Sequence, residues 1–360
     1  MSAISPNRKW SHSRSALIRV LVIDDSVVMR STIARMFEGG CGVDVAGMFA
    51  TTKDAFDFLS REQVDVVLLD HEMPGQKGLD ALPAIIEAAK GAHVIMLSSH
   101  CKRGEKTTVK ALSLGAADAI AKPTSRDSTP QFSQTLIKRV RDLAASSKTA
   151  PAPADKLPMR AAPRGLEVKC IAIGASTGGI HTLSDLLGAN TDKPGVPIFV
   201  TQHLPEAFMP YYAEQVARMS SLPVSIAKAG EFVRNDHIYI APGNANVGCE
   251  KFGNQMRIAL SDAHDTLTNT RPSVNLMFRS LAKCYGAGAL GIVLTGIGRD
   301  GTAGAEAIVK QGGTVIAQDA QSSVIWGMPG AVTRAGLASA NLRPEHMLDF
   351  IQSSRSGEGA

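Results

Sequence analysis

Five polar side chains in the first third of the sequence follow short apolar runs, at positions that suit phosphoryl chemistry. Asp24 and Asp25 follow IRVLVI, and Asp70 ends VDVVLLD. Ser98 and Lys122 come after two later runs, HVIML and DAIA. If these runs are parallel strands, their carboxyl ends meet at one edge of a sheet, where ligands bind. Carboxylates gathered there repel one another unless a hard cation such as Mg²⁺ neutralises them, so the pattern predicts a phosphoryl-accepting site on Asp70.

A second set of side chains suits nucleophilic catalysis. The run CIAIGASTGG contains G-x-S-x-G over 174–178, a turn that exposes the hydroxyl of Ser176 and leaves backbone N–H groups free for an oxyanion. A serine nucleophile needs a base, and the base needs a carboxylate that orients it. His203 ends the apolar run PIFVTQH, and Asp300 follows GIVLTGIGR. These three residues form a candidate catalytic triad.

The loop around Asp300 also permits another interpretation. GIGRDG over 296–301 fits G-x-G-x-x-G, and Asp319 ends the next apolar run about twenty residues later, as in dinucleotide-binding domains. The negative charge of Asp300 would oppose a pyrophosphate in that loop, and the motif comes late in the chain. The nucleotide-binding hypothesis is therefore the weaker alternative.

Both sets of residues require parallel sheets to position them. Apolar runs alternate with amphipathic stretches in each half, which predicts two α/β domains, a flavodoxin-like one and a Rossmann-like doubly wound one. An Ala- and Pro-rich stretch separates them. The sequence predicts a basic tail over 1–17, a first domain over 18–147, a linker over 148–166, a second domain over 167–350 and a tail over 351–360.

Composition excludes several other classes of protein. The net charge of +5 is concentrated in residues 1–17 and 148–166, each with a charge of +3, while 18–147 is neutral and 167–360 carries −1, so no basic face for nucleic acid is expected. The five cysteines are scattered and include no C-x-x-C pair, which argues against zinc sites and disulfides. No apolar run approaches the length of a membrane span, and we expect a cytoplasmic protein without membrane insertion.

The first domain resembles the receiver domains of two-component response regulators in the motifs VIDDS, LLDHEMPGQKGLD, MLSS, LGAAD and AKP. By this resemblance Asp70 is the phosphoacceptor, which receives its phosphoryl group from a histidine kinase. Ser98 and Lys122 would sense that group. Ala119 stands where many receivers have an aromatic switch residue, which puts the usual coupling from the phosphate to the surface in doubt.

The same resemblance implies a Mg²⁺ site. Asp25 and Asp70 would ligate the ion together with the backbone carbonyl of Glu72, and Asp24 would act through water. The second domain needs no cofactor for its chemistry.

The second domain resembles the catalytic domain of chemotaxis protein-glutamate methylesterases in IGASTGG, FVTQHLPEAF, YIAPGN, RPSVN, LTGIGRDG and AQDAQSSVIWGMPGAV. The resemblance makes Ser176 the nucleophile, His203 the general base and Asp300 its orienting partner. The oxyanion would form against the N–H groups of Thr177 and Gly178.

Four residues depart from the pattern of that family. Ile297 replaces a Met linked to the oxyanion hole, Asn246 replaces a His, Asn275 replaces an Asp and Ala229 replaces an Asp. With the triad intact, these departures are interpreted as divergence of the substrate surface.

Together the two resemblances imply a phosphorylation-regulated serine hydrolase. It would remove methyl esters from glutamyl side chains in the cytoplasmic domains of chemoreceptors, release methanol, and deamidate receptor glutamines as a second activity. We expect the unphosphorylated receiver to cover the edge that carries Ser176. The alternative is a phosphorylation-gated binding module that performs no turnover.

Overall fold

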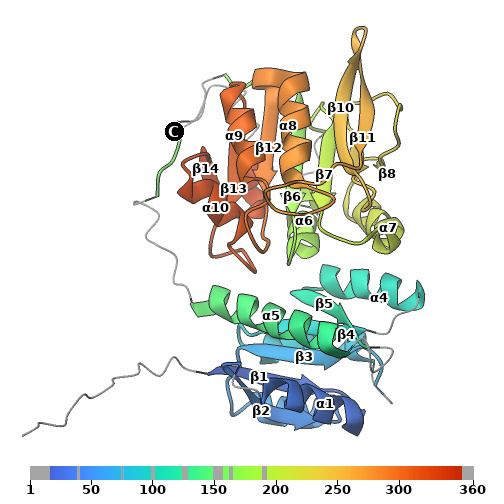
Figure 1. Ribbon diagram of the computed structural model, residues 1–360, viewed down its shortest axis with the longest axis vertical. Coiled ribbons are helices and arrows are strands. Elements are labelled where there is room, and N and C mark those ends of the chain that lie inside the picture. The colour runs from blue at the N-terminus through green and yellow to red at the C-terminus, as the bar shows by residue number, and fades with distance from the viewer. Residues whose placement is uncertain are drawn as a thin grey trace, which may run out of the picture.

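The computed structural model describes most of the chain as two α/β domains (Figure 1). The described residues are 17–38, 41–73, 75, 77–98, 102–123, 129–148, 157–161, 165–188 and 193–350. None of the helices in this part of the chain is long and apolar enough to cross a membrane.

The N-terminal domain is a five-stranded parallel sheet with the order β2-β1-β3-β4-β5. Its central strands are continuous runs of buried residues, as expected of a sheet that helices cover on both faces. Its strands are β1 (Ile18–Ile23), β2 (Val43–Phe49), β3 (Val66–Asp70), β4 (His93–Ser98) and β5 (Asp118–Ala121). Its helices are α1 (Val27–Phe37), α2 (Thr52–Leu59), α3 (Gly78–Ala88), α4 (Lys102–Ser113) and α5 (Thr129–Lys148).

The C-terminal domain is built on a seven-stranded parallel sheet with the order β14-β13-β12-β6-β7-β9-β8. The strand order reverses at β6, so that the sheet is doubly wound and its two halves meet there. The strands of this sheet are β6 (Cys170–Ala175), β7 (Ile198–Gln202), β8 (Val224–Ile226), β9 (Ile238–Ile240), β12 (Ala289–Val293), β13 (Thr314–Gln318) and β14 (Ala340–Leu342). The helices are α6 (Gly179–Gly188), η3 (Glu206–Phe208), α7 (Met209–Met219), α8 (Val274–Tyr285), η4 (Gly286–Gly288), α9 (Thr302–Lys310), α10 (Met328–Arg334) and η5 (Pro344–His346).

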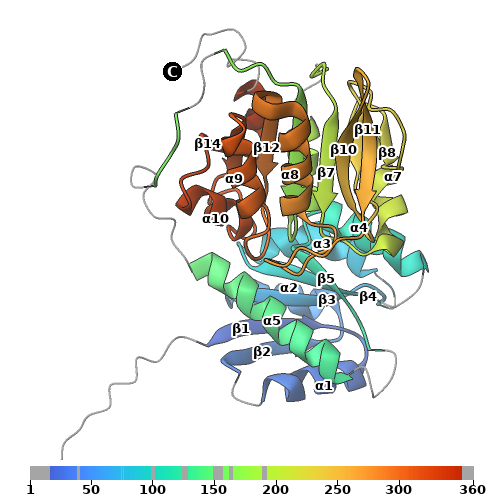
Figure 2. The same cartoon turned by 45° about the horizontal axis from the view of Figure 1, so that its top comes forward.

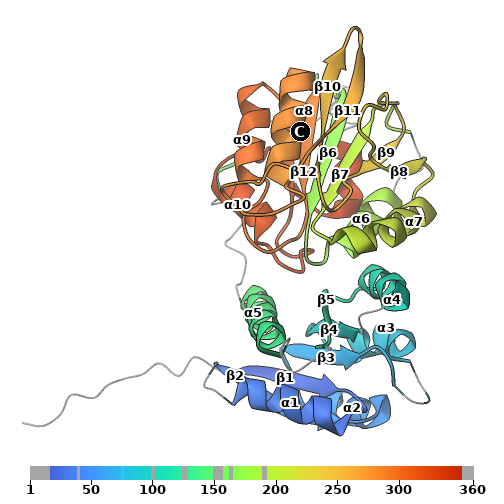
Figure 3. The ribbon, with the colours of Figure 1, turned by 45° about the vertical axis from the view of Figure 1, so that its right-hand side comes forward.

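An antiparallel hairpin of β10 (Asn246–Phe252) and β11 (Gln255–Ser261) extends the C-terminal domain at the end far from the first domain (Figure 3). Its first half packs against α8, which places Asn246 at the start of that helix.

The edge strand β5, with α4 and α5 on either side of it, faces the carboxyl ends of the C-terminal strands (Figures 2 and 3). The contact is partly apolar: Leu112 on α4 is buried in one cluster with Ile180 and Leu183 of α6. The domains therefore meet face to face, and the strand ends of the second domain lie at the junction.

Polar contacts cross the same junction. The N–H of Gly178 donates to the carbonyl of Ala117 (3.2 Å), and Ser146 Oγ on α5 donates to the carbonyl of Val324 (2.9 Å). His181 Nδ1 on α6 lies 3.1 Å from the carbonyl oxygen of Ser113 at the end of α4. The backbone contact at Gly178 brings the first domain directly onto the turn that follows β6.

The predicted fold class is confirmed, with a flavodoxin-like strand order in the first domain and a doubly wound sheet in the second. The hairpin β10–β11 and the short edge strands β8 and β14 were not anticipated, because their sequences are partly exposed and lack long apolar runs.

The predicted tail over 1–17 and the tail over 351–360 lie almost wholly outside the described residues, as does most of the predicted linker. Of that linker, residues 157–161 are described, and the N–H of Arg160 donates to the carbonyl of Ala338. The domain boundaries remain predictions.

We expect Leu112→Asp to separate the two domains, because it places a charge in the apolar contact between α4 and α6, where a buried charge is costly. Small-angle scattering should show a larger radius of gyration, while each domain keeps its own thermal transition. Leu114→Asp is the matched control, since Leu114 is 38% exposed. An unchanged radius of gyration for Leu112→Asp would contradict the importance of this contact.

Candidate active site

The turn after β6 presents Ser176 at the carboxyl edge of the sheet. Its N–H donates to the carbonyl of Thr295, which follows β12 on the neighbouring strand (3.0 Å). Gly178 has a φ of +79°, and a Cβ there would lie 2.6 Å from Val324 Cγ2. Glycine is therefore required at this position for both conformation and space, as expected of a tight turn that exposes a hydroxyl.

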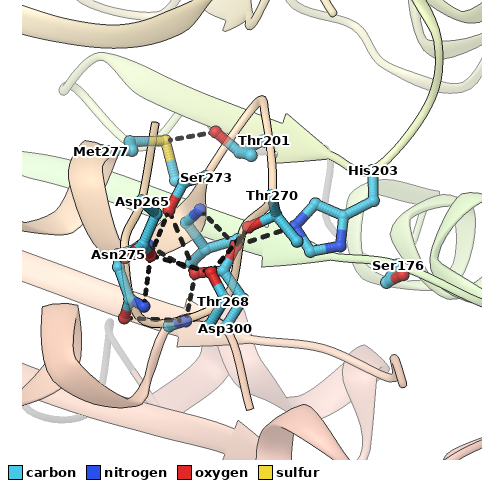
Figure 4. A network of polar contacts seen from close by, with 12 residues as sticks. Ser176, Thr201, His203, Asp265, Thr268, Thr270, Ser273, Asn275, Met277 and Asp300 are labelled. Carbon is cyan, nitrogen blue, oxygen red and sulfur yellow. Dashed lines mark hydrogen bonds and ion pairs between the residues drawn. The ribbon is translucent and has the colours of Figure 1, made fainter. Parts of the chain in front are cut away.

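His203 is held beside this turn by the backbone. Its N–H donates to the carbonyl of Ala175 (3.1 Å), so that the end of β7 stays next to the end of β6. The imidazole Nε2 lies 2.8 Å from Asp300 Oδ2. The other ring nitrogen, Nδ1, lies on the side of the ring nearer Ser176 (Figure 4). The structure thus brings the three predicted residues together in the order serine, histidine, aspartate.

Asp300 is a buried carboxylate with an unusually full set of donors. Its oxygens accept hydrogen bonds from the N–H groups of Val274 (2.8 Å), Asn275 (3.0 Å) and Gly301 (2.9 Å), and from the hydroxyls of Thr270 (3.1 Å) and Ser273 (3.2 Å). Two of these N–H groups belong to the first turn of α8, which favours an anion.

These contacts decide the charge of Asp300. Burial alone would raise the pKa of this carboxyl, but the hydrogen bond and charge of His203 and the N–H groups of Asn275 and Val274 outweigh it. The pKa of Asp300 therefore lies below its usual range, and the side chain is ionised beside the imidazole at neutral pH.

The predicted oxyanion residues lie at the same edge. Thr177, Gly178 and Ile297 line one cavity of about 770 Å³ together with Ser176 and His203. The N–H of Gly178 is already engaged, because it donates to the carbonyl of Ala117 in the first domain. The described hydrogen bonds include none between Ser176 and His203, so the nucleophile and base are adjacent but not bonded in this arrangement.

The first domain supplies part of the wall of that cavity. Leu112, Ala117, Asp118, Lys138 and Arg139 line it opposite the triad. The junction between the domains and the candidate active site are therefore the same place.

Two of the departures noted in the sequence were interpreted wrongly. Asn246 and Asn275 are 3% and 1% exposed, so they are not part of a substrate surface. Asn246 Oδ1 accepts the N–H of Ser273, and Asn275 bonds Asp265 and the turn after Asp300. Ala229 is exposed, as the interpretation required.

Sequence reasoning also missed Asp265, Thr270 and Ser273, which surround Asp300 from a loop distant in sequence (Figure 4). The density of short polar residues in DTLTNTRPSVN, with a Ser before a helical stretch, was the available signal for a capped helix start.

The nucleotide-binding alternative is not supported by the geometry. Asp300 is buried against α8, and Asp319 is used by its own turn, where its Oδ1 accepts the N–H groups of Gln321 (2.7 Å) and Ser322 (2.8 Å). Neither carboxylate is free to bind a ribose.

The acidic cluster of the first domain is also brought together. Ligand oxygens of Asp24, Asp25 and Asp70 lie within 4.8 Å of one another. Lys122 Nζ contacts Asp70 Oδ1 (2.7 Å) and Asp24 Oδ2 (2.8 Å) as ion pairs. Ser98 is buried at the end of the neighbouring strand β4.

Burial raises the pKa of Asp70, although Lys122 opposes the shift. The two carboxylates in turn raise the pKa of Lys122 against the effect of burial, so that its ammonium group is retained. A buried carboxylate that resists ionisation gains from a further cation.

The donor set fits Mg²⁺. Asp24 Oδ2 is buried beside the ammonium group of Lys122 (2.8 Å), and a carboxylate oxygen with one such partner retains a further acceptor site for a cation. Asp25 is exposed, which leaves room for the waters that Mg²⁺ keeps. Glu72 lies beside the cluster, and its N–H donates to Asp70 Oδ1 (3.3 Å). Position 119 carries a half-buried alanine and therefore presents no aromatic ring to the junction.

Two family models match the chain. The model of the CheB methylesterase matches residues 171–351, and that of the response regulator receiver domain matches residues 20–131.

Full-length relatives agree with both matches. A protein-glutamate methylesterase/protein-glutamine glutaminase of Paramagnetospirillum magneticum is 38% identical, and the alignment covers 90% of this chain and 93% of the relative. A protein of the same name from Caulobacter vibrioides is 36% identical over 93% of this chain and 98% of its own length. The solved catalytic domain of the Thermotoga maritima CheB methylesterase is 34% identical to this chain, with a TM-score of 0.49. The match covers 51% of this chain and 97% of the solved domain.

We expect Asp300→Asn to slow the reaction of Ser176 with a serine-directed phosphonate by up to about 10⁴-fold, because an amide does not stabilise the imidazolium that forms in the transition state. Labelling of Ser176 measured by mass spectrometry checks this expectation. Asp319→Asn is the control, because it removes a carboxylate from a neighbouring strand end without touching His203. Equal labelling rates in the two variants would contradict the assignment of Asp300.

Proposed function

The chain belongs to the CheB methylesterase family, in which a receiver domain precedes a hydrolase, and on this premise we propose that Ser176, His203 and Asp300 hydrolyse methyl esters of glutamyl side chains on chemoreceptors. Deamidation of receptor glutamines at the same site follows from the second activity that the relatives' names carry. The observation that carries the proposal is the His203–Asp300 pair at 2.8 Å beside Ser176.

The reaction begins when Ser176 Oγ attacks the ester carbonyl and His203 Nδ1 takes its proton. The oxyanion of the tetrahedral intermediate is stabilised by the N–H groups of Thr177 and Gly178, beside Ile297. His203 then returns the proton to the methoxy oxygen, and methanol leaves; with a glutamine the leaving group is ammonia. Water attacks the acyl-enzyme with His203 again as base, which frees the glutamate and restores the serine.

Asp300 acts on the imidazole and not on the substrate. Its ionised carboxylate holds His203 with Nδ1 toward the serine and stabilises the imidazolium in each half of the reaction. The hydrogen bonds from α8 keep that carboxylate charged in a buried position.

The receiver domain is phosphorylated on Asp70 by a histidine kinase. Asp24, Asp25, Asp70 and the carbonyl of Glu72 would hold Mg²⁺, which when bound neutralises charge that develops on the phosphoryl group. Ser98 and Lys122 would bind the oxygens of the phosphorylated side chain.

Regulation acts through occlusion of the active site. In the arrangement described, the carbonyl of Ala117 accepts the N–H of Gly178 that the oxyanion would need, and Leu112 of the first domain lines the cavity. Phosphorylation would shift the population toward separated domains, since a signal can move this equilibrium only if it favours the open state. The relatives' names favour turnover over a binding module. A cytoplasmic location is part of the proposal, because the proposed receptor domains and kinase would be met there.

We expect the full chain to release methanol from methylated receptor fragments, and we expect acetyl phosphate with Mg²⁺ to increase the rate. Ser176→Ala should abolish release in both conditions. Asp70→Asn should keep the basal rate and lose the stimulation. Failure of the wild-type chain to release methanol with Asp70 phosphorylated would contradict the proposed activity, and stimulation of Asp70→Asn would contradict the proposed phosphorylation site.

A further inference from the structure

A second buried carboxylate lies directly behind the triad. Asp265 is 2% exposed, and its oxygens accept four hydrogen bonds. The donors are the N–H of Leu267 (2.9 Å), the hydroxyls of Thr268 (2.9 Å) and Ser273 (2.9 Å), and the amide of Asn275 (2.8 Å). Burying a carboxylate costs free energy unless hydrogen-bond donors satisfy its oxygens, so a fully bonded carboxylate at this position suggests a specific role.

Three routes of close polar contacts lead from Asp265 to Asp300. The hydroxyl of Ser273 lies within bonding distance of Asp265 Oδ2 (2.9 Å) and of Asp300 Oδ1 (3.2 Å). A hydroxyl has one proton, so Ser273 donates to only one of the two carboxylates at a time. The hydroxyl of Thr268 bonds Asp265 and contacts Thr270, which donates to Asp300 (3.1 Å). Each route ends on the carboxylate that orients the imidazole.

Asn275 provides the third route and joins two loops. Its Nδ2 donates to Asp265, and its Oδ1 accepts the N–H groups of Gly301 (3.0 Å) and Gly304 (2.8 Å). Its own N–H donates to Asp300 (3.0 Å). One amide side chain therefore ties the loop 265–273 to the turn that carries Asp300, and only a side chain with both a donor and an acceptor can do so.

We infer that Asp265 and Asn275 are positioning residues of the esterase site. As a carboxylate–amide pair they hold the loop 265–273 and the turn 300–304 around Asp300, and Asp265 supplies a second negative charge behind the imidazole of His203. This inference rests on the proposed function, because the imidazole is the general base of that reaction.

Asp265 is ionised in this role. Burial alone would raise the pKa of this carboxyl, but the hydrogen bonds of Asn275, Leu267, Thr268 and Ser273 lower it below its usual range. Among the described residues, His203 is the one titratable side chain that bonds either carboxylate. The neighbouring His264 is exposed. The other charged side chains that line the cavity are Asp118, Lys138, Arg139, Arg271 and Arg299.

The test exchanges the charge between the two positions. We compare Asp265→Asn, Asn275→Asp and the double variant by methanol release from methylated receptor fragments, using the full chain activated with acetyl phosphate and Mg²⁺. Displacement of a catalytic group by a fraction of an ångström to about 1 Å slows turnover by up to about 100-fold, so each single variant should lose kcat with little change in KM.

The pH profile separates positioning from simple destabilisation. Asp265→Asn removes a negative charge that favours the imidazolium, so the acid limb of kcat/KM should move to lower pH. Asn275→Asp adds a charge and should move this limb to higher pH. In the double variant one N–H of the amide at 265 donates to the carboxylate at 275 and the other donates to one of the two hydroxyls, while the single negative charge of the pair is kept, so kcat and the acid limb should return toward the wild type.

The control is Asp262→Asn, which removes an exposed carboxylate three residues away. A wild-type rate and pH profile for Asp265→Asn, or a double variant no better than the worse single variant, would overturn the inference. Ser176 labelling by a phosphonate is measured in parallel. If the wild-type chain labels but releases no methanol, the proposed substrate fails, and labelling rates of the variants still test the positioning.

Discussion

One buried negative charge, the carboxylate of Asp300, constrains the C-terminal domain more than any other single group. This side chain is 2% exposed and lies between the N-terminus of α8 and the imidazole of His203. Its buried charge is stabilised by five protein donors and the imidazole. Removing a buried charge's partners is strongly destabilising, so the segment 265–275 must keep its conformation. The conformation of a loop distant in sequence thus fixes the donors that keep Asp300 charged beside His203.

The two domains use the same feature of parallel sheets for different chemistry. In each one, strand ends gather polar side chains at a single edge. The acidic cluster of the first domain lies at the carboxyl ends of β1, β3 and β5, with Asp70 ending β3 and Lys122 directly after β5, and it is β5 with α4 and α5 that meets the second domain. The backbone carbonyl of Ala117 accepts the N–H of Gly178 directly. In the proposed mechanism the domain contact and the oxyanion would therefore compete for that one donor.

The strands and the residues at their carboxyl ends could be predicted from the sequence, because both depend on the local pattern of apolar and polar residues. Each predicted strand end carried its functional residue, and Ser176, His203 and Asp300 converge as the parallel arrangement requires. What it could not reveal depends on contacts between distant segments. From the sequence, Asn246 and Asn275 were interpreted as part of the substrate surface. Both are buried, because the hairpin and α8 pack against each other at these positions. Asp265 carries no motif, and its role follows only from the four donors that fold around it.

In the proposed regulation, contact between the receiver and the carboxyl edge of the second sheet governs access to Ser176. The most direct test is the rate at which a phosphonate labels Ser176 in the full chain, with and without Mg²⁺ and beryllofluoride, a stable mimic of the phosphoryl group on Asp70. We expect faster labelling with beryllofluoride and no response in Asp70→Asn. Equal labelling rates with and without beryllofluoride, in a chain shown to bind it, would contradict control of the triad by the receiver.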